Sequence, residues 1–149
     1  MIVLDASAWI DIARARASQA LSDLVVSDPH WVVPEHFALE VLSALRGAHL
    51  GGDLDQLGFA RAVRDLADSP LDVWPTTPLI PRIVQLTHDA TTYDASYVAL
   101  AEGLGCRLIT ADAKFARIPG IRCPVLTFSA DQISAGMTSR SKSSTPERS

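Results

Sequence analysis

Residues 91–115 decide the fold class, and they read TTYDASYVALAEGLGCRLITADAKF. Residues 92–104 predict a helix that ends at Gly105, because glycine commonly terminates helices. A short strand is predicted directly afterwards, at residues 107–109. A helix that leads straight into a short apolar strand is typical of a crossover between parallel strands.

Similar short apolar runs recur along the chain and predict further strands. They lie at residues 2–4, 31–33, 71–74 and, more weakly, 124–126. Helices are predicted between them, at residues 6–15, 19–26, 35–50, 53–67 and 78–86. Asp53 is the predicted N-cap of the fourth of these helices. The pattern indicates an α/β fold, with a central, mostly parallel sheet of four to five short strands flanked by helices.

The length of 149 residues suits one domain, and 48% hydrophobic with 20% charged residues excludes a disordered chain. The composition changes near residue 135. Residues 1–135 are predicted to form the domain, and the serine-rich residues 136–149 a disordered tail. That tail holds three of the 13 basic and one of the 17 acidic residues, which leaves the domain with a charge of −6.

Several classes of function are disfavoured by what the sequence lacks. Two cysteines, Cys106 and Cys123, are too few for a disulfide scaffold or a zinc knuckle. The sequence contains no GxxxxGK[ST] loop, no GxGxxG after the first strand, no HExxH and no GxSxG. No run approaches the roughly 18 apolar residues of a membrane span, and the N-terminus does not read as a signal peptide. The predicted location is the cytoplasm.

Two aspartates follow predicted strands directly. Asp5 comes after residues 2–4, and Asp112 follows residues 107–110 after one alanine. In an open parallel sheet, ligands bind outside the carboxyl ends of the strands, so both acids are predicted to lie at that edge. For each of them, an N-cap of the following helix or turn is the structural alternative.

Two further acids lie on predicted helices. Glu40 stands at the margin of an apolar stripe, one turn from Phe37 and Ala44, where a carboxylate needs a cation or hydrogen-bond partner. Asp94 opens the helix at residues 92–104 and shares a face with Val98. The alternatives are an arginine partner for Glu40 and a favourable helix-dipole interaction for Asp94.

Four such acids on four elements favour a metal site. Converging carboxylates repel and raise one another's pKa unless a cation holds them. Sites made only of oxygen ligands suit Mg²⁺ or Mn²⁺ rather than zinc.

At this point the sequence resembles PIN-domain endoribonucleases, particularly the small VapC-type toxins of bacterial toxin–antitoxin pairs. Four segments carry the resemblance: MIVLDASAWID at 1–11, PEHFALEVLSAL at 34–45, the 91–115 stretch, and CPVLTF at 123–128. Their order and spacing cover nearly all of the predicted domain.

The resemblance implies a PIN-like fold and the toxin component of a type II toxin–antitoxin system. It implies catalytic, metal-binding acids that hold Mg²⁺ or Mn²⁺ and hydrolyse RNA phosphodiesters through metal-activated water; they are Asp5, Glu40, Asp94 and Asp112. Ser7 and Thr110 match the small hydroxyl positions beside this site. Some members carry an additional acid shortly after the last aspartate, where this chain has Ala113 and Lys114.

The resemblance also implies partners. Candidate RNA-binding residues are the basic ones close to the acidic turns, with surface solvation as the alternative: Arg14, Arg16, Lys114 and Arg117. These toxins usually form homodimers and are inhibited by a VapB-type antitoxin whose tail enters the groove. The net charge of −4 argues against a nucleic-acid binder unless a bound metal offsets it.

Two other functions stay open at this stage. One is a non-catalytic PIN fold that binds RNA or a protein. The other is a receiver-like or haloacid-dehalogenase-like phosphotransfer domain, which also places an aspartate after its first strand. No Asp-x-Asp follows the first strand here, and the strand at 71–74 ends in Trp-Pro, which disfavours the phosphotransfer domain.

Overall fold

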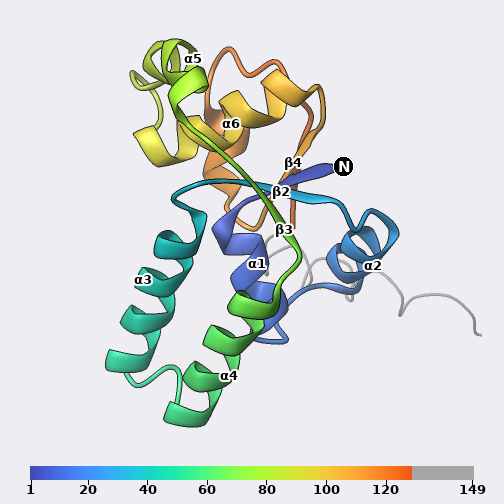
Figure 1. Ribbon diagram of the computed structural model, residues 1–149. Coiled ribbons are helices and arrows are strands. Elements are labelled where there is room, and N and C mark those ends of the chain that lie inside the picture. The colour runs from blue at the N-terminus through green and yellow to red at the C-terminus, as the bar shows by residue number, and fades with distance from the viewer. Residues whose placement is uncertain (129–149) are drawn as a thin grey trace, which may run out of the picture.

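The computed structural model describes residues 1–128 of the chain (Figure 1). The end of the predicted domain, at 129–135, and the predicted tail, at 136–149, lie outside the described residues. Five parallel strands form one sheet in the order β3-β2-β1-β4-β5. They are β1 Ile2–Leu4, β2 Trp31–Pro34, β3 Leu71–Trp74, β4 Arg107–Thr110 and β5 Val125–Thr127. The predicted α/β class with a parallel sheet is confirmed.

Strand β1 is the centre of the molecule. Its three residues are fully buried, and Val3 pairs with Val32 of β2 on one side and Leu108 of β4 on the other. Short, wholly apolar strands of this kind are stable only where helices cover both faces of the sheet.

Helices supply that cover between successive strands. They are α1 Ala6–Ala13, α2 Gln19–Ser27, α3 Phe37–Leu50, α4 Gln56–Asp68, α5 Ile80–Leu86 and α6 Thr92–Leu104. Short 3₁₀ helices add Thr77–Leu79 and Ala113–Arg117. In Figure 1, α5 and α6 lie on one side of the sheet, and α1 with the α3–α4 hairpin lies on the other. None of the helices within residues 1–128 is long and apolar enough to span a membrane.

Helix α6 is the most deeply buried of these elements. Eight consecutive residues, Asp94 to Ala101, are buried between the sheet and α5. This burial explains why an aspartate in its first turn is withdrawn from solvent.

Two predicted helix starts are wrong, for reasons that lie in the tertiary structure. The helix predicted from residue 35 begins at Phe37, because the Glu35 main-chain N–H donates to Trp74 and its carboxylate accepts hydrogen bonds from Thr76. Asp53 is not an N-cap. Asp55 caps α4 instead, accepting from Gly58, and Asp53 pairs with Arg14, the residue after α1.

Candidate active site

The site lies where the direction of chain winding reverses. From β1 the chain proceeds through β2 to β3 at one edge, and then returns to place β4 on the opposite side of β1. The connecting helices therefore cover opposite faces and part at the carboxyl ends of β1 and β4, which leaves a crevice there. Asp5 follows β1, and its main-chain N–H donates to the carbonyl oxygen of Ile109 in β4 at 2.9 Å. This hydrogen bond joins the carboxyl ends of the two strands.

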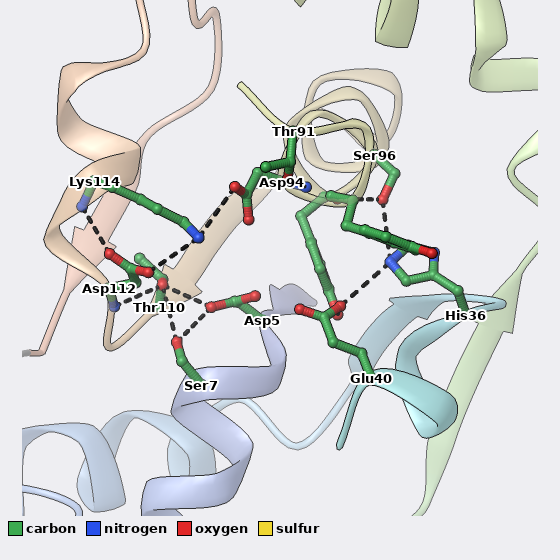
Figure 2. A network of polar contacts seen from close by, with 12 residues as sticks. Asp5, Ser7, His36, Glu40, Thr91, Asp94, Ser96, Thr110, Asp112 and Lys114 are labelled. Carbon is green, nitrogen blue, oxygen red and sulfur yellow. Dashed lines mark hydrogen bonds and ion pairs between the residues drawn. The ribbon is translucent and has the colours of Figure 1, made fainter. Parts of the chain in front are cut away.

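Asp5 is the most buried acid of the crevice, at 3% exposure. One carboxylate oxygen, Oδ2, accepts hydrogen bonds from Thr110 Oγ1 at 2.8 Å and from Ser7 Oγ. Although Asp5 occupies the N-cap position of α1, its side chain makes no capping hydrogen bond. The capping alternative is therefore wrong for this residue. Figure 2 shows its other oxygen directed toward Glu40.

Among residues 1–128, no basic side chain forms an ion pair with Asp5, whose partners are hydroxyls. Burial raises the pKa of Asp5 to about 6. The two hydroxyl hydrogen bonds oppose this rise, and the nearby charges of Glu40 and Asp94 add to it. A buried carboxylate with these neighbours is stabilised by any positive charge placed beside its open oxygen.

Ser7 and Thr110 join the two strand ends. Ser7 Oγ accepts from the main-chain N–H of Ala111 at 3.0 Å, and Thr110 Oγ1 accepts from that of Asp112 at 2.9 Å. The two hydroxyl oxygens are 3.2 Å apart. These bonds fix the turn after β4 against the start of α1, and thereby hold Asp5 and Asp112 near one another.

Glu40 reaches the crevice from α3. Its Oε2 accepts from the Tyr97 hydroxyl at 2.9 Å and lies 3.4 Å from His36 Nε2. Burial alone would raise the pKa of Glu40, but the hydrogen bonds from His36 and Tyr97 outweigh it and hold that pKa below its usual range. Burial and the carboxylates of Glu40 and Asp5 raise the pKa of Tyr97, so its hydroxyl stays protonated and donates. The alternative for Glu40, an arginine partner, is therefore wrong, because a tyrosine and a histidine hold this carboxylate instead.

Asp94 and Asp112 share one lysine. Lys114 Nζ lies 3.1 Å from Asp94 Oδ2 and 3.2 Å from Asp112 Oδ2 (Figure 2). The other Asp112 oxygen accepts from the Lys114 main-chain N–H at 2.9 Å, so Asp112 also caps its 3₁₀ helix. Asp94 is 5% exposed, and Thr91 rather than Asp94 caps α6. Burial would lower the pKa of Lys114, but these two carboxylates raise it instead.

The structure thus brings all four predicted acids to one crevice, from four different elements (Figure 2). Asp5 stands between Glu40 on one side and the Asp94–Asp112 pair on the other. Across residues 1–128, no three acid, histidine or cysteine side chains stand close enough together to hold an ion as they are. Metal binding would require these carboxylates to turn from their present partners.

The predicted basic residues do not all belong to this crevice. Arg14 is bound to Asp53, with Nη2 at 2.9 Å from both a main-chain and a side-chain oxygen, so it ties α1 to the α3–α4 loop. Arg16 pairs with Asp11 at 3.3 Å, yet lines a hollow that also includes Ser7 and Asp112. Arg117 is exposed on the 3₁₀ helix that carries Lys114.

Three site residues were missed from the sequence. His36 and Tyr97 orient Glu40, and the exposed Tyr93 lies against His36 with ring centroids 5.0 Å apart. For two of them, the spacing from a predicted acid indicates a position on the same helix face as that acid. His36 stands four residues before Glu40, and Tyr97 stands three residues after Asp94.

Comparison with known proteins gives matches over most of the chain. The model of the PIN domain family matches residues 2–121. Ribonuclease VapC12 of Mycobacterium tuberculosis is 35% identical over 120 residues, which cover 80% of this chain and 93% of that protein.

Two solved structures share the fold. The crystal structure of PAE2754 from Pyrobaculum aerophilum superposes with a TM-score of 0.63 at 21% identity, covering 91% of this chain and 88% of that one. A toxin–antitoxin complex from Klebsiella pneumoniae gives 0.59 at 20% identity, covering 85% and 97%.

The buried Asp5 carboxylate makes stability depend on pH in metal-free protein. Its folded pKa lies above its value of 3.8 in the unfolded chain, so its contribution to stability is present below pH 4 and is lost as the pH rises through about 6. Above that range the penalty is about 3 kcal/mol. We expect Asp5→Asn in chelator to melt higher than the wild type at pH 7.5, with the difference vanishing near pH 4.

Thermal unfolding followed by circular dichroism measures this difference. Asp65→Asn, which neutralises an exposed acid of α4, is the control and should show no such pH-dependent difference. Equal melting temperatures of Asp5→Asn and wild type at pH 7.5 would contradict the prediction.

Proposed function

The chain belongs to the PIN domain family, among its VapC ribonucleases, and we propose that it is a metal-dependent endoribonuclease that serves as the toxin of a toxin–antitoxin pair. One observation carries the proposal: four carboxylates from four elements meet at the carboxyl edge of the sheet, and the most buried of them has an oxygen open to a cation. Family membership overturns the phosphotransfer alternative. The non-catalytic alternative is addressed by the cleavage experiment below.

The donor set fits Mg²⁺ or Mn²⁺, because it consists of carboxylate oxygens and contains no thiolate. The residues that would hold the ion are Asp5, Glu40, Asp94 and Asp112. When bound, such an ion supplies activated water and stabilises charge on phosphate oxygens. The chain's own hydroxyls orient the acids: Ser7 and Thr110 leave one Asp5 oxygen open, and Tyr97 fixes Glu40.

An RNA strand would follow the hollows that flank the acids. One is lined by residues that include Thr91, Asp94 and Lys114, and another by Ser7, Arg16 and Asp112. We propose Arg16, Lys114 and Arg117 as phosphate contacts, and we leave Arg14 out because Asp53 already holds it. The domain charge of −6 makes long-range steering of RNA weak, so recognition depends on these local cations and the metal.

A third hollow adjoins Glu40, and the Leu39 side chain and the Tyr93 ring in its lining suit a base. It is formed by His36, Leu39, Glu40, Ser43 and Tyr93. Tyr93 is 58% exposed. A nucleobase next to the scissile phosphate would stack on this ring, an interaction that tolerates any base.

We also propose a homodimer and a VapB-type antitoxin as partners. Large apolar side chains are exposed on three helices, namely Leu39 and Leu50 of α3, Leu57 of α4, and Ile80 and Val84 of α5. Such side chains support contacts with a second copy and with an antitoxin segment. A basic antitoxin side chain placed among the four carboxylates would displace the metal and close the groove.

We place the reaction in the cytoplasm. Both cysteines, Cys106 and Cys123, are free thiols, the state that a reducing compartment maintains.

Replacement of one acid of the crevice tests the proposed ribonuclease activity directly. Asp94→Asn should lower Mn²⁺-dependent cleavage of total cellular RNA by about 100-fold or more, because loss of a ligand weakens metal binding more than loss of a supporting group does. Asp65→Asn is the matched control and should cleave as the wild type does. RNA ends are mapped by sequencing, with chelator as the blank. Unchanged cleavage by Asp94→Asn would refute the assignment and favour a binding module.

Substitutions of Tyr93 test whether an RNA base stacks on its ring. In the Asp94→Asn background, which prevents cleavage, Tyr93→Ala should weaken the affinity for a single-stranded RNA octamer by about 1–3 kcal/mol. Tyr93→Trp should retain the affinity because it keeps an aromatic face. Fluorescence anisotropy of labelled RNA measures both. If Tyr93→Ala bound as tightly as Tyr93→Trp, no base would stack there.

Release of metal on binding of the antitoxin tests the proposed mode of inhibition. Co-expression with the neighbouring small gene product should give a tight complex without RNA cleavage. Adding that partner to the Mn²⁺-loaded toxin should free Mn²⁺, which is seen as the electron paramagnetic resonance signal of the aqueous ion. A complex that retains its Mn²⁺ would rule out the inserted cation, although not the pairing.

A further inference from the structure

The cations of the crevice are distributed unevenly. At one end, Lys114 Nζ contacts both Asp94 and Asp112, at 3.1 and 3.2 Å. At the other end, among the described residues, Asp5 forms no ion pair, and Glu40 has only His36 at 3.4 Å. One end of the site therefore contains a permanent positive charge, and the other does not.

We propose that the Lys114 ammonium is the second cation of this active site, so that the chain binds one divalent metal where a two-metal nuclease binds two. The inference rests on the proposed function. It narrows the four acids of the proposed metal site to three, Asp5, Glu40 and Asp94, and leaves Asp112 to Lys114. Asp94 would contact both cations, because one of its oxygens is paired with Lys114 and the other is directed toward Asp5.

The chemistry of an ammonium group fits this position. In two-metal sites the ions lie about 3.5–4 Å apart and stabilise the attacking and leaving oxygens of a phosphate. A lysine ammonium carries one charge and three N–H donors. Two donors face Asp94 and Asp112, which leaves the third for a phosphate oxygen.

The setting of Lys114 keeps that third donor accessible. The side chain is about half exposed, and it lines a hollow together with Thr91, Asp94 and Ile118. Its main-chain N–H is bonded to Asp112 Oδ1, which fixes the origin of the side chain beside the acids. Lys114 is thus anchored at its backbone, paired at its tip, and open to a strand of RNA in the hollow.

The charge balance favours the same arrangement. Four carboxylates and two divalent ions would cancel, but the lysine has already offset one carboxylate charge before any metal binds. A second divalent ion would have to displace Lys114 from two carboxylates, one of which, Asp94, is 5% exposed. The first ion meets no such competitor at the open oxygen of Asp5.

Metal stoichiometry tests the proposal without reference to activity. Isothermal titration of Mn²⁺ into the full chain should give one ion per wild-type chain and two per chain of Lys114→Met, which keeps the length of the side chain without its charge. Lys114→Arg retains a cation and should bind one. Arg117→Met removes the same charge three residues away and should also bind one.

Thermal unfolding of the metal-free variants provides a second readout. Lys114→Met should melt lower than Arg117→Met, because Asp94 and Asp112 lose their shared cation, and Mn²⁺ should raise its melting temperature more than that of the wild type. Two ions per wild-type chain, or one per Lys114→Met chain, would overturn the inference. A wild type that binds one Mn²⁺ but leaves RNA intact would instead count against the proposed function alone.

Discussion

Repulsion between carboxylates is the constraint on which the rest of this site depends. Four acids approach one another at the edge of a narrow sheet, and two of them, Asp5 and Asp94, are almost fully buried. Three kinds of partner hold them: hydroxyls for Asp5, a phenol and an imidazole for Glu40, and one shared ammonium for Asp94 and Asp112. Because the hydroxyls carry no charge, burial raises the pKa of Asp5 to about 6 despite them, whereas the partners of Glu40 hold its pKa below the usual range.

The topology makes the gathering of these acids unavoidable. A sheet that winds outward from its central strand and then returns on the other side must separate its covering helices at that strand. Residues that follow β1 and β4 therefore face a common crevice, while α3 and α6 approach it from opposite faces of the sheet. Asp5 and Asp112 are held at the ends of two paired strands, β1 and β4, whatever the cost in repulsion.

Most of the fold and the positions of the acids could be predicted from the sequence, because strands, helices and the residues that follow them depend on local sequence patterns. Strand ends located Asp5 and Asp112, and the apolar stripe of α3 located Glu40, without any knowledge of contacts. What the sequence did not predict depends on which side chain reaches a given partner through space. Asp53 was assigned to a helix cap, but Arg14, 39 residues away, holds it instead. Lys114 was assigned to RNA, yet the folded chain places its ammonium between two acids.

The position of Lys114 changes how the acidic composition is understood. Counted from the sequence, the domain carries a charge of −6, which disfavours a polyanionic substrate. Counted in the fold, much of that charge lies in one crevice that attracts positive groups from any source. The chain's own lysine and one divalent ion would share these oxygens, and a basic side chain of a partner would compete with both for them. Under the proposed function, binding of RNA, which would need cations in the crevice, and inhibition by a basic partner, which would replace them, are two consequences of one electrostatic arrangement.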